Sequence, residues 1–291
     1  MKYKIYLLIL LSLGSSQLFG QKNKNGRVLK IASYNIQYDN LNDTVNTWNK
    51  RLPGVVSVFK KYEFDIVGSQ EPYLMQLNGL MPQIPEYTYL GINITGRDGV
   101  MRKHYTPIFY KKEKFDVLDW GTFWFSETPN EAGKKGWDAY SPRICTWAKF
   151  KDKLSGKQFY FFNVHFDHLG KEARTESAKL LLSEIRNKAK GYPIFVTGDF
   201  NTVQNTSDYK ILSESGTVGD SYHLTADRRS NATPTYNGYL KYPKGIERID
   251  HIYVSLKPEI KVKNYTILTD SYDGMYPSDH FPILIEAELP R

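Results

Sequence analysis

Six short polar motifs lie where apolar, strand-like runs of the sequence begin or end. They are rich in carboxylates, amides and imidazoles, the side chains that bind hard divalent cations and transfer protons. In chain order the motifs are Ser33-Tyr34-Asn35, Ser69-Gln70-Glu71-Pro72, Asn163-Val164-His165-Phe166-Asp167-His168, Gly198-Asp199-Phe200-Asn201, Arg248-Ile249-Asp250-His251 and Ser278-Asp279-His280-Phe281. Because each motif borders an apolar run, we expect these side chains at the rim of a sheet and not in its core.

Such residues supply what the hydrolysis of a phosphate ester requires. That reaction needs a divalent cation, a group that orients or deprotonates the attacking water, and donors to the transition state. The oxygen ligands of Asn35, Glu71 and Asp279 suit Mg²⁺, or alternatively Mn²⁺, better than zinc. Asp199 and Asn201 are two residues apart, so in an extended segment both side chains point to one face.

Each motif taken alone also has a structural explanation. Asn35 after a strand is typical of a turn, and Glu71 before Pro72 is typical of a solvated loop. A single histidine such as His165 is more often hydrogen-bonded within the fold than catalytic. The specific signal is therefore the combination of the motifs and their order along the chain.

Short apolar segments predict a sheet-rich fold that holds these motifs. Helical spacing of apolar residues predicts one helix from Trp48 to Phe59 and a second from Arg174 to Ile185. The predicted strands are Val28–Tyr34, Asp65–Ser69, Pro107–Tyr110, Ile144–Phe150, Phe159–Val164, Pro193–Thr197, Ile249–Val254 and Pro282–Ala287. Polar segments 93–106, 127–141 and 220–247 are long for structureless connections, and loops of this kind often carry binding function.

In this order the motifs resemble those of the endonuclease/exonuclease/phosphatase superfamily, which includes DNase I, inositol polyphosphate 5-phosphatases and nocturnin-like deadenylases. The resemblance runs from Asn35 to His280. The Asn-x-His-x-Asp-His segment at residues 163–168 is most similar to the deadenylase and nocturnin-like branch. The resemblance implies an α/β fold of the DNase I-like type, a four-layer sandwich. Two mixed β-sheets then pack face to face with helices outside, and the active site lies at one edge.

The resemblance also implies roles for the matching residues around the metal. Glu71 corresponds to the principal metal ligand, assisted by Asn35 and Asp279. Asp199 looks like the residue that aligns or deprotonates the attacking water, and Asn201 like a donor to a phosphoryl oxygen.

Two histidines match family positions at the phosphate. His280 resembles the histidine that contacts the scissile phosphate, and Asp250 resembles the carboxylate that orients it. A nearby carboxylate favours the imidazolium form, but whether His280 acts as a charged donor or a neutral base stays open. His165 matches the second histidine, a candidate general acid or phosphate ligand, and it shares a strand face with Asn163 by the period-two rule.

Four further residues are candidates for the site. Tyr110 resembles the position where an aromatic hydroxyl approaches the phosphate, although it also fits a core or rim tyrosine. Arg143 opens a strand after a polar loop, where a guanidinium could clamp a phosphate or form a surface salt bridge. Asn163 and His168 are candidate substrate contacts, and a loop hydrogen bond is the alternative for His168.

Composition excludes several classes of protein. The chain has 291 residues, of which 41% are hydrophobic, 24% charged and 14% aromatic, so it is neither fibrous nor intrinsically disordered. Its single Cys145 cannot form an internal disulfide and fits a buried apolar position. The net charge of +8 suits an anionic substrate but is weaker than the clustered basic stripe of a duplex-DNA binder.

The first twenty residues have the pattern of a secretory signal peptide. Lys2 and Lys4 precede an apolar run from Ile5 to Leu11, and the segment ends near the small Gly20. This run is too short to span a bilayer, so we expect a periplasmic or secreted protein with no stable membrane insertion, although a short anchor is an alternative. No cysteine for lipid attachment lies nearby. Without repeats or linkers, residues 21–291 are predicted to form one domain.

The substrate is less well defined by the sequence. The segment Asp119–Trp147 is rich in aromatic residues, and we expect part of it to form a wall that stacks on a sugar ring or a base. The first hypothesis is an exported, monomeric, Mg²⁺-dependent phosphatase or phosphodiesterase acting on small sugar-containing phosphoesters. The second is a secreted nuclease with RNA or DNA as its partner. A secreted binding protein without catalysis is the third, although all the expected catalytic residues are present.

Overall fold

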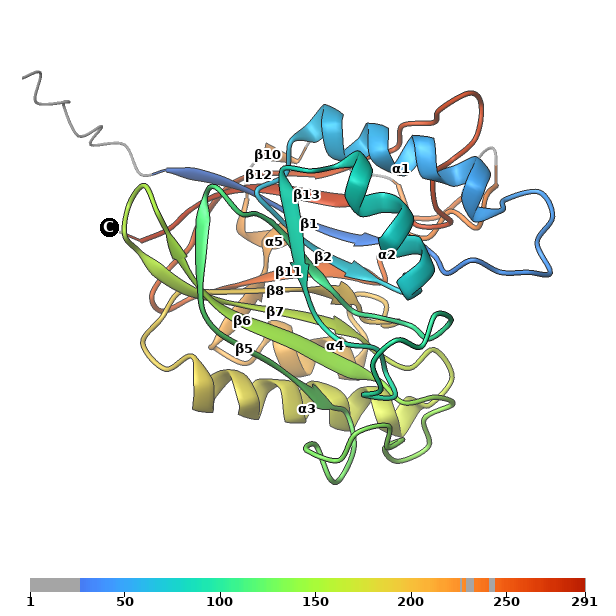
Figure 1. Ribbon diagram of the computed structural model, residues 1–291. Helices are drawn as coiled ribbons and strands as arrows, with labels where there is room; N and C mark the ends of the chain where they lie inside the picture. The colour runs from blue at the N-terminus through green and yellow to red at the C-terminus, as the bar shows by residue number, and fades with distance from the viewer. Residues whose placement is uncertain (1–26, 226, 229–232, 241–243, 291) are drawn as a thin grey trace, which may run out of the picture.

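Two mixed β-sheets pack face to face in the part of the chain that the computed structural model describes, residues 27–225, 227–228, 233–240 and 244–290 (Figure 1). The seven-stranded sheet has the order β10 (Asp227–Arg228), β12 (Lys261–Ile267), β13 (Ile283–Glu288), β1 (Val28–Asn35), β2 (Ile66–Gln70), β4 (Ile108–Lys111) and β3 (Tyr87–Leu90). The six-stranded sheet has the order β5 (Phe115–Trp124), β6 (Ile144–Asp152), β7 (Gln158–His165), β8 (Ile194–Asp199), β11 (Asp250–Ser255) and β9 (Val218–Asp220).

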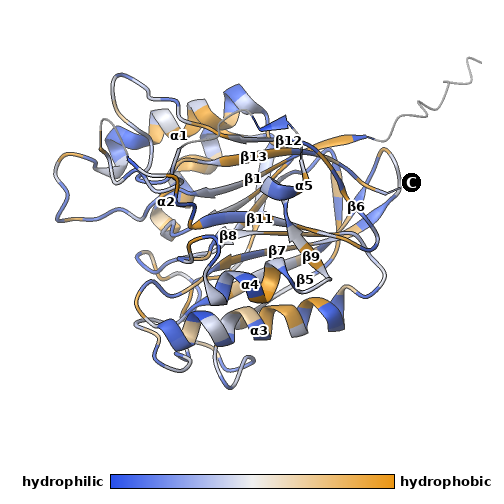
Figure 2. Cartoon of the chain, turned by 180° about the vertical axis from the view of Figure 1, so that it is seen from behind, coloured by the Kyte–Doolittle hydropathy of each residue, from blue (hydrophilic) through white to orange (hydrophobic). Residues whose placement is uncertain are grey.

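Helices cover the outer faces of both sheets. α1 (Trp48–Tyr62) and α2 (Leu74–Leu80), which continues into a 3₁₀ turn (Met81–Gln83), lie on the seven-stranded sheet. α3 (Lys171–Lys188) and α4 (Ser207–Ser213) lie on the six-stranded sheet, and the short α5 (Ser221–Leu224) follows β9. Figure 2 shows α1 and α3 on opposite sides of the molecule, each with polar and apolar segments. This arrangement confirms the predicted four-layer sandwich.

The two predicted helices form because each has one apolar face. In α1 the residues Trp48, Val55 and Phe59 recur at helical spacing and are buried against the seven-stranded sheet. In α3 the residues Leu181 and Ile185 are buried against the six-stranded sheet in the same way. The core between the sheets is made of aliphatic and aromatic side chains from the inner face of both sheets.

All eight predicted strands are present, with ends that differ from the prediction by at most two residues. The structure adds β3, β5, β9, β10 and β12, which were not predicted. Most of these lie at or near sheet edges, where one face is solvated and the apolar signal is weak. In β5, for example, six consecutive residues from Asp116 to Gly121 are at least partly exposed.

Parallel crossovers bring the carboxyl ends of four strands to one edge of the sandwich. β1 and β2 are parallel and are joined through α1, and β7 and β8 are parallel and are joined through α3. β13 is antiparallel to β1, and β11 is antiparallel to β8, so both begin at this same edge. The residues at the C-terminal ends of β1, β2, β7 and β8 must therefore lie close to the residues at the N-terminal ends of β11 and β13.

The predicted signal peptide, residues 1–20, lies outside the described residues. Among the residues that the structure describes, no helix has both the length and the apolar character that a bilayer crossing requires.

Candidate active site

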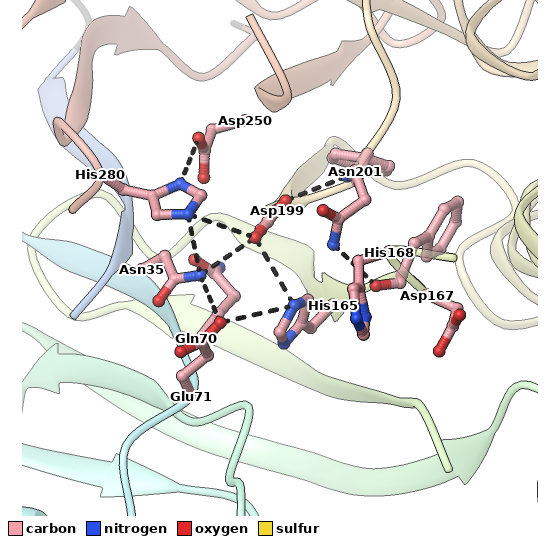
Figure 3. A network of polar contacts seen from close by, with 12 residues as sticks. Asn35, Gln70, Glu71, His165, Asp167, His168, Asp199, Asn201, Asp250 and His280 are labelled. Carbon is pink, nitrogen blue, oxygen red and sulfur yellow. Dashed lines mark hydrogen bonds and ion pairs between the residues drawn. The ribbon is translucent and has the colours of Figure 1, made fainter. Parts of the chain in front are cut away.

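The six polar motifs meet at the shared edge of the two sheets (Figure 3). Asn35 ends β1 and Glu71 directly follows β2 in the seven-stranded sheet. In the six-stranded sheet, His165 ends β7 and Asp199 ends β8. The remaining two side chains come from antiparallel strands: Asp250 begins β11, where it pairs with Asp199, and His280 lies three residues before β13. The sheet topology explains why residues so far apart in sequence form one site.

Asn35 joins the two sheets at the centre of this site. Its Nδ2 donates hydrogen bonds of 3.1 Å to Glu71 Oε1 and 3.0 Å to Asp199 Oδ2. The same nitrogen lies 3.5 Å from His280 Nε2, while Oδ1 accepts a 2.9 Å hydrogen bond from the backbone N–H of Gln37. The amide therefore bridges the carboxylates of Glu71 and Asp199, which come from the two sheets.

Three residues in the loops that carry the site have left-handed backbone conformations. The φ angles are 53° at Gln37, 77° at Glu71 and 49° at Asn201. Such values are uncommon for residues other than glycine, and they cluster at functional sites. At Glu71 this conformation accompanies a hydrogen bond from Tyr38 N–H to Oε2, 3.1 Å, which aims the carboxylate back toward Asn35.

His280 is paired with a carboxylate in the opposite sheet. Its Nδ1 lies 2.8 Å from Asp250 Oδ2, and its Nε2 lies 3.8 Å from Asp199 Oδ2. Burial alone would lower the pKa of His280, but the charges of Asp250 and Asp199 outweigh it and raise this pKa well above its usual value. The site therefore favours the imidazolium form of His280.

His165 has the opposite electrostatic surroundings. Burial and the positive charge of Arg143 lower the pKa of His165 well below its usual value. The Arg143 Nη1 atom lies 3.1 Å from Nε2 and 3.2 Å from Nδ1 of the imidazole. His165 Nε2 also lies 3.5 Å from Asp199 Oδ2. The two predicted site histidines are thus brought together and are held in different protonation states.

The residues around Asp199 fit a divalent cation. One ligand atom each from Glu71, His165 and Asp199 lie within 4.8 Å of one another, and Asp199, Asp250 and His280 form a second such group. Burial, followed by the charge of Asp250, raises the pKa of Asp199 to about 7. A cation bound between these acidic side chains would offset the cost of burying their charges, and their oxygen atoms suit Mg²⁺ or Mn²⁺. Glu71 is the side chain best placed to hold it, with Asp199 beside it.

Two predicted metal ligands have different contacts in the structure. Asn35 turns its amide nitrogen, not its oxygen, toward the carboxylates. Asp279 lies on the cavity wall, where its Oδ2 accepts a 2.9 Å hydrogen bond from Gln37 Nε2, and it belongs to neither group of potential ligands. Burial, opposed by the charge of His280 and reinforced by that of Glu71, raises the pKa of Asp279 to about 6. Metal ligation by Asn35 and Asp279 stays a prediction.

Arg143 is fixed inside the site wall and is not part of a surface salt bridge. It is 6% exposed, and its Nε lies 3.1 Å from Asp167 Oδ2. Its Nη2 lies 2.9 Å from Nδ1 of the exposed His168, and both residues line the cavity, where contact with substrate stays a prediction. Burial disfavours the ionised form of Asp167, but N–H groups of Gly170 and Leu169 and the charge of Arg143 hold its pKa well below the usual range.

Asn201 also lies at the cavity. Its backbone N–H donates to Asp199 Oδ1, 3.0 Å, and its Nδ2 donates to the carbonyl oxygen of Phe166, 3.0 Å. These two bonds hold the side chain beside Asp199, where the second N–H of the amide remains available to a ligand. The placement agrees with the predicted role, which stays a prediction.

The structure corrects the prediction for Tyr110. This residue pairs with Ile66, four residues before the end of β2, and so lies toward the far end of the strand. Its half-buried ring packs against the core between the sheets, 5.2 Å from the ring of Phe150. The residues just before β4 that line the cavity are Arg102, Lys103 and His104, because β4 runs antiparallel to β2.

The structure also corrects the prediction for Asn163, which holds the two sheets together and does not line the cavity. Its Nδ2 donates to the carbonyl oxygens of Ser69, 2.7 Å, and Pro107, 2.9 Å. Its Oδ1 accepts from Gln70 Nε2, 2.7 Å, and Thr197 Oγ1, 3.0 Å. The side chain is fully buried. The period-two rule correctly placed Asn163 on the face of His165, but that face is covered by the opposite sheet at this depth.

The site opens into a cavity of about 840 Å³. Its walls come from residues at the edge and from the three long polar segments, as expected for loops that carry function. The lining residues are Tyr38, Glu71, Tyr73, Ile94, Arg102, Lys103, His104, Tyr140, Ser141, Arg143, His165, His168, Leu169, Asp199, Asn201, Tyr236, Ile249, Asp279 and His280.

Of the aromatic residues in the segment Asp119–Trp147, which was expected to contribute a wall at the phosphate, Tyr140 alone lines the cavity in the part of the chain that the structure describes. Among the lining residues that the structure describes there is no tryptophan, and the aromatic rings belong to tyrosines and histidines. Trp147, for example, packs against Tyr160 on the six-stranded sheet, with the Lys188 ammonium 4.7 Å from its ring. Tyrosine is frequent throughout this sequence, so no sequence signal distinguished the tyrosines at the cavity.

Sequence reasoning also missed Arg51, which positions two loops of the site. This α1 side chain is 1% exposed and donates to the carbonyl oxygens of Ile36, 2.6 Å, and Pro277, 3.0 Å. Further hydrogen bonds reach the carbonyl oxygens of Gln37 and Tyr38. Arg51 therefore ties the loop after β1 to the segment that precedes Asp279 and His280. An arginine within an otherwise apolar helical pattern was the available signal.

A comparison with known families agrees with this geometry. The sequence profile of the endonuclease/exonuclease/phosphatase family matches residues 32–280, a stretch that includes every candidate site residue. The chain belongs to this family. The resemblance inferred from the six motifs is thereby confirmed, together with the fold it implied.

Solved structures and curated relatives place this family member among phosphoester hydrolases. It is 39% identical to a mannosyl-6-phosphatase of Bacteroides thetaiotaomicron, with a TM-score of 0.84, over 89% of this chain and 99% of that one. The human nocturnin catalytic domain, 20% identical with a TM-score of 0.71 over 90% of this chain and 93% of that one, shares the fold. A Ccr4 exoribonuclease subunit of the CCR4-Not complex from Mycosarcoma maydis is 22% identical, and the match covers 90% of this chain and 50% of that protein.

Proposed function

We propose that this family member is a divalent-metal-dependent phosphatase acting on small, sugar-containing phosphate monoesters. The observation that carries the proposal is the convergence of Glu71, Asp199 and the His280–Asp250 pair at the inner end of one cavity. This combination of adjacent buried carboxylates and a charged imidazole suits an anionic substrate that reaches the site together with a cation.

The residues divide the chemistry between them. When bound, Mg²⁺ would neutralise charge on the phosphoryl oxygens. Asp199 Oδ2 is positioned to orient the attacking water and accept its proton, because a pKa raised to about 7 matches that task near neutral pH. His280, held as an imidazolium by Asp250, is positioned to donate a hydrogen bond to a phosphoryl oxygen.

The opposite wall adds neutral and positive groups. His165 is held neutral beside Arg143, so its imidazole can donate or accept one hydrogen bond without adding charge. Arg143 contributes a permanent positive charge that favours binding of a phosphate in the cavity. Asn201 is placed to donate its free amide N–H to the same group.

The similarity to a mannosyl-6-phosphatase supports a sugar phosphate as the substrate, because it extends over nearly the whole of both chains. The similarity to an exoribonuclease subunit favours a second candidate, a nuclease acting on RNA. Arg102 and Lys103 at the cavity would suit a polyanion as well. We favour the phosphatase because the sequence identity is 39% for that relative and 22% for the exoribonuclease subunit.

We further propose that the protein is exported and acts as a monomer in the periplasm or outside the cell. Support comes from the basic and apolar pattern of residues 1–20. Export predicts that the protein recovered from its native cell lacks this segment, which intact-mass measurement tests. Light scattering after size-exclusion chromatography tests the monomer.

Product release from a substrate panel tests the proposed activity. The panel contains mannose 6-phosphate, glycerol phosphate, a phosphodiester, single-stranded RNA and plasmid DNA, each with Mg²⁺, with Mn²⁺ or with EDTA. Asp199→Ala serves as the control for contaminating hydrolases. We expect metal-dependent release of phosphate from mannose 6-phosphate by the unmodified protein only. Cleavage of RNA or DNA without release from sugar phosphates would replace the phosphatase with the nuclease, and an inactive protein would favour the binding scaffold.

A further inference from the structure

The cavity is larger than the chemistry at its inner end requires. Its volume of about 840 Å³ lies in the range of sites for whole organic ligands and exceeds what a phosphate group occupies. The carboxylates and imidazoles described above line only part of its wall. The remaining wall must contact whatever is attached to the phosphate.

Three aromatic side chains form a compact group on this wall, next to Glu71. The ring centroids of Tyr38 and Tyr73 are 5.5 Å apart, and those of Tyr38 and His104 are 5.0 Å apart. Tyr73 and His104 complete the triangle at 5.3 Å. We call Tyr38, Tyr73 and His104 the ring cluster. All three side chains line the cavity and are half-buried, so each keeps part of its surface open to a ligand.

The ring cluster is physically connected to the carboxylate that is best placed to bind the metal. The backbone N–H of Tyr38 donates to Glu71 Oε2, and the backbone N–H of Glu71 donates to the carbonyl oxygen of Tyr105, the neighbour of His104. The imidazole of His104 also lies parallel to that of His165, with centroids 6.5 Å apart. A group resting on the ring cluster would therefore be adjacent to the place where the phosphate is held.

The hydroxyls of Tyr38 and Tyr73 and the imidazole of His104 form no hydrogen bond with a side chain or backbone group in the described parts of the chain, and His104 interacts only electrostatically with the Glu71 carboxylate. Half-buried polar groups of this kind are satisfied by water or by a ligand. Two hydroxyls and an imidazole offer both donors and acceptors, which matches a ligand that carries several hydroxyl groups.

The shape of the ring cluster favours a puckered ring over a flat base. Its three rings are inclined to one another by 47°, 31° and 44°, so they form an angled surface and not a parallel-sided slot. A nucleobase stacks best on a flat ring face, whereas a sugar ring presents C–H groups and hydroxyls in several directions. Arg102, which is paired with Asp39 Oδ2 at 3.0 Å and lies 5.9 Å from the Tyr73 ring, adds donors for hydroxyl oxygens at the cavity.

We infer that the ring cluster of Tyr38, Tyr73 and His104 is the subsite for the sugar that carries the phosphate, an inference that rests on the proposed phosphatase function. The sugar packs its C–H face on the rings and exchanges hydrogen bonds with their polar atoms. Its phosphate then points toward Glu71 and Asp199. The ligand class is a hexose phosphate, and the ring cluster distinguishes it from phosphates with a small or flexible alcohol.

Equilibrium binding tests the subsite separately from turnover. Isothermal titration calorimetry with Mg²⁺ compares mannose 6-phosphate with glycerol phosphate in the slow variant Asp199→Asn. The same pair is measured in Asp199→Asn combined with Tyr73→Ala or with Tyr73→Phe, which keeps the ring and removes the hydroxyl. We expect Tyr73→Ala to reduce the preference for mannose 6-phosphate by about 10- to 100-fold, the range for loss of a packed apolar contact. The preference of the Tyr73→Phe protein for mannose 6-phosphate should lie between that of the protein with Tyr73 intact and that of Tyr73→Ala.

Trp120→Ala is the matched control. Trp120 is an aromatic residue on β5 that is 43% exposed and does not line the cavity, so its loss should leave the preference within about twofold. A preference for mannose 6-phosphate that Tyr73→Ala and Tyr38→Ala do not change would overturn the subsite, even if the protein hydrolyses sugar phosphates. An equal affinity of the Asp199→Asn protein for mannose 6-phosphate and glycerol phosphate would also overturn the subsite.

Other outcomes separate the subsite from the proposed function. If the ring variants lose the preference in calorimetry but the unmodified protein does not release phosphate from any sugar phosphate, the subsite is supported and the phosphatase is wrong. If Tyr73→Ala instead weakens binding of a short oligoribonucleotide and leaves the binding of mannose 6-phosphate unchanged, the ring cluster holds a base and the sugar subsite is overturned.

Discussion

His280 Nδ1 lies 2.8 Å from Asp250 Oδ2, and this contact joins the segment before β13 in one sheet to the first residue of β11 in the other. The pair fixes which imidazole nitrogen faces the carboxylate and leaves Nε2 directed toward Asp199 and Asn35 (Figure 3). The charge state of a residue at the centre of the site thus depends on how closely the two sheets are packed.

The first prediction concerns the pH dependence of activity. The carboxylate of Asp250 helps to raise the pKa of His280, so removal of its charge in Asp250→Asn lowers that pKa. Because His280 is proposed to act as an imidazolium, activity falls when pH rises through its pKa. The basic limb of the kcat/KM profile should therefore move to lower pH in Asp250→Asn, with a loss in kcat of about 10- to 100-fold. A basic limb that does not move, measured beside His280→Ala, would contradict the assignment.

The second prediction concerns stability without a metal ion. Burial and the charge of Asp250 raise the pKa of Asp199 from its usual value of 3.8 to about 7. A folded-state pKa above the unfolded one means that this group's stabilising effect is present at low pH and is lost as pH rises through about 7. At pH 8 in EDTA, Asp199→Asn should therefore be more stable than the unmodified protein by about 1–3 kcal/mol. This difference in stability between Asp199→Asn and the unmodified protein should become smaller as the pH falls toward 4.

Thermal unfolding across this pH range measures the effect. Asp116→Asn, which removes a half-exposed carboxylate on β5, controls for the change in net charge. Addition of Mg²⁺ should stabilise the unmodified protein more than Asp199→Asn, because a cation that binds only the folded state shifts the equilibrium toward it. Lower stability of Asp199→Asn at pH 8 in EDTA would contradict the prediction.

The third prediction concerns the metal. Glu71→Gln keeps the size of the side chain and removes the charge that is best placed to hold a divalent cation. We expect the Mg²⁺ concentration for half-maximal activity to rise by about tenfold or more, with partial recovery at high Mg²⁺. Glu172→Gln, an exposed residue in the first turn of α3, is the control. An unchanged Mg²⁺ dependence in Glu71→Gln would exclude Glu71 as the main ligand.

The fourth prediction concerns the support of the site from α1. Arg51→Met leaves the carbonyl oxygens of Ile36, Gln37 and Pro277 without their buried donor. Loss of several charged hydrogen bonds should lower the free energy of unfolding by about 2–4 kcal/mol, and activity should fall because two site loops are released. Lys60→Met, on the exposed face of the same helix, should change neither quantity measurably. Normal stability of Arg51→Met in urea titration would refute this role.

The fifth prediction separates structural from functional residues. Tyr110 packs on Phe150 away from the cavity, so Tyr110→Phe should leave kcat and KM within about twofold of the unmodified values. Asn163→Ala should lower the free energy of unfolding by about 2–4 kcal/mol, because four buried hydrogen bonds are lost. A large loss of activity in Tyr110→Phe would restore the expectation that its hydroxyl contacts the phosphate.

The sequence was sufficient to predict the central strands and both long helices. Buried strands such as β7 contain short apolar runs, and α1 and α3 have one apolar face, so their patterns reflect burial directly. Edge strands such as β3 and β10 were missed because they are short and partly exposed. These strands form because they pair with a neighbouring strand, and their own apolar patterns are too weak to predict them.

The candidate site was also largely predictable, because its residues stand at strand ends. The order of the motifs identified the family, and the positions of Asn35, Asp199 and His165 follow from where the apolar runs stop. The same reasoning failed for Asn163. Its side chain lies on the same strand face as that of His165, but the opposite sheet covers it there. The sequence of one strand does not show how deeply each of its residues is buried between the two sheets.

The sequence by itself therefore determined the family, the sheet-rich architecture and the chemical types at the strand ends, since these depend on local patterns and on motif order. Only the tertiary structure decided which groups meet. It placed Arg143 against His165 and brought the ring cluster to the cavity. Each of these contacts joins segments far apart in the chain. Their distances depend on how the two sheets pack, which is a property of the whole core and not of any one segment.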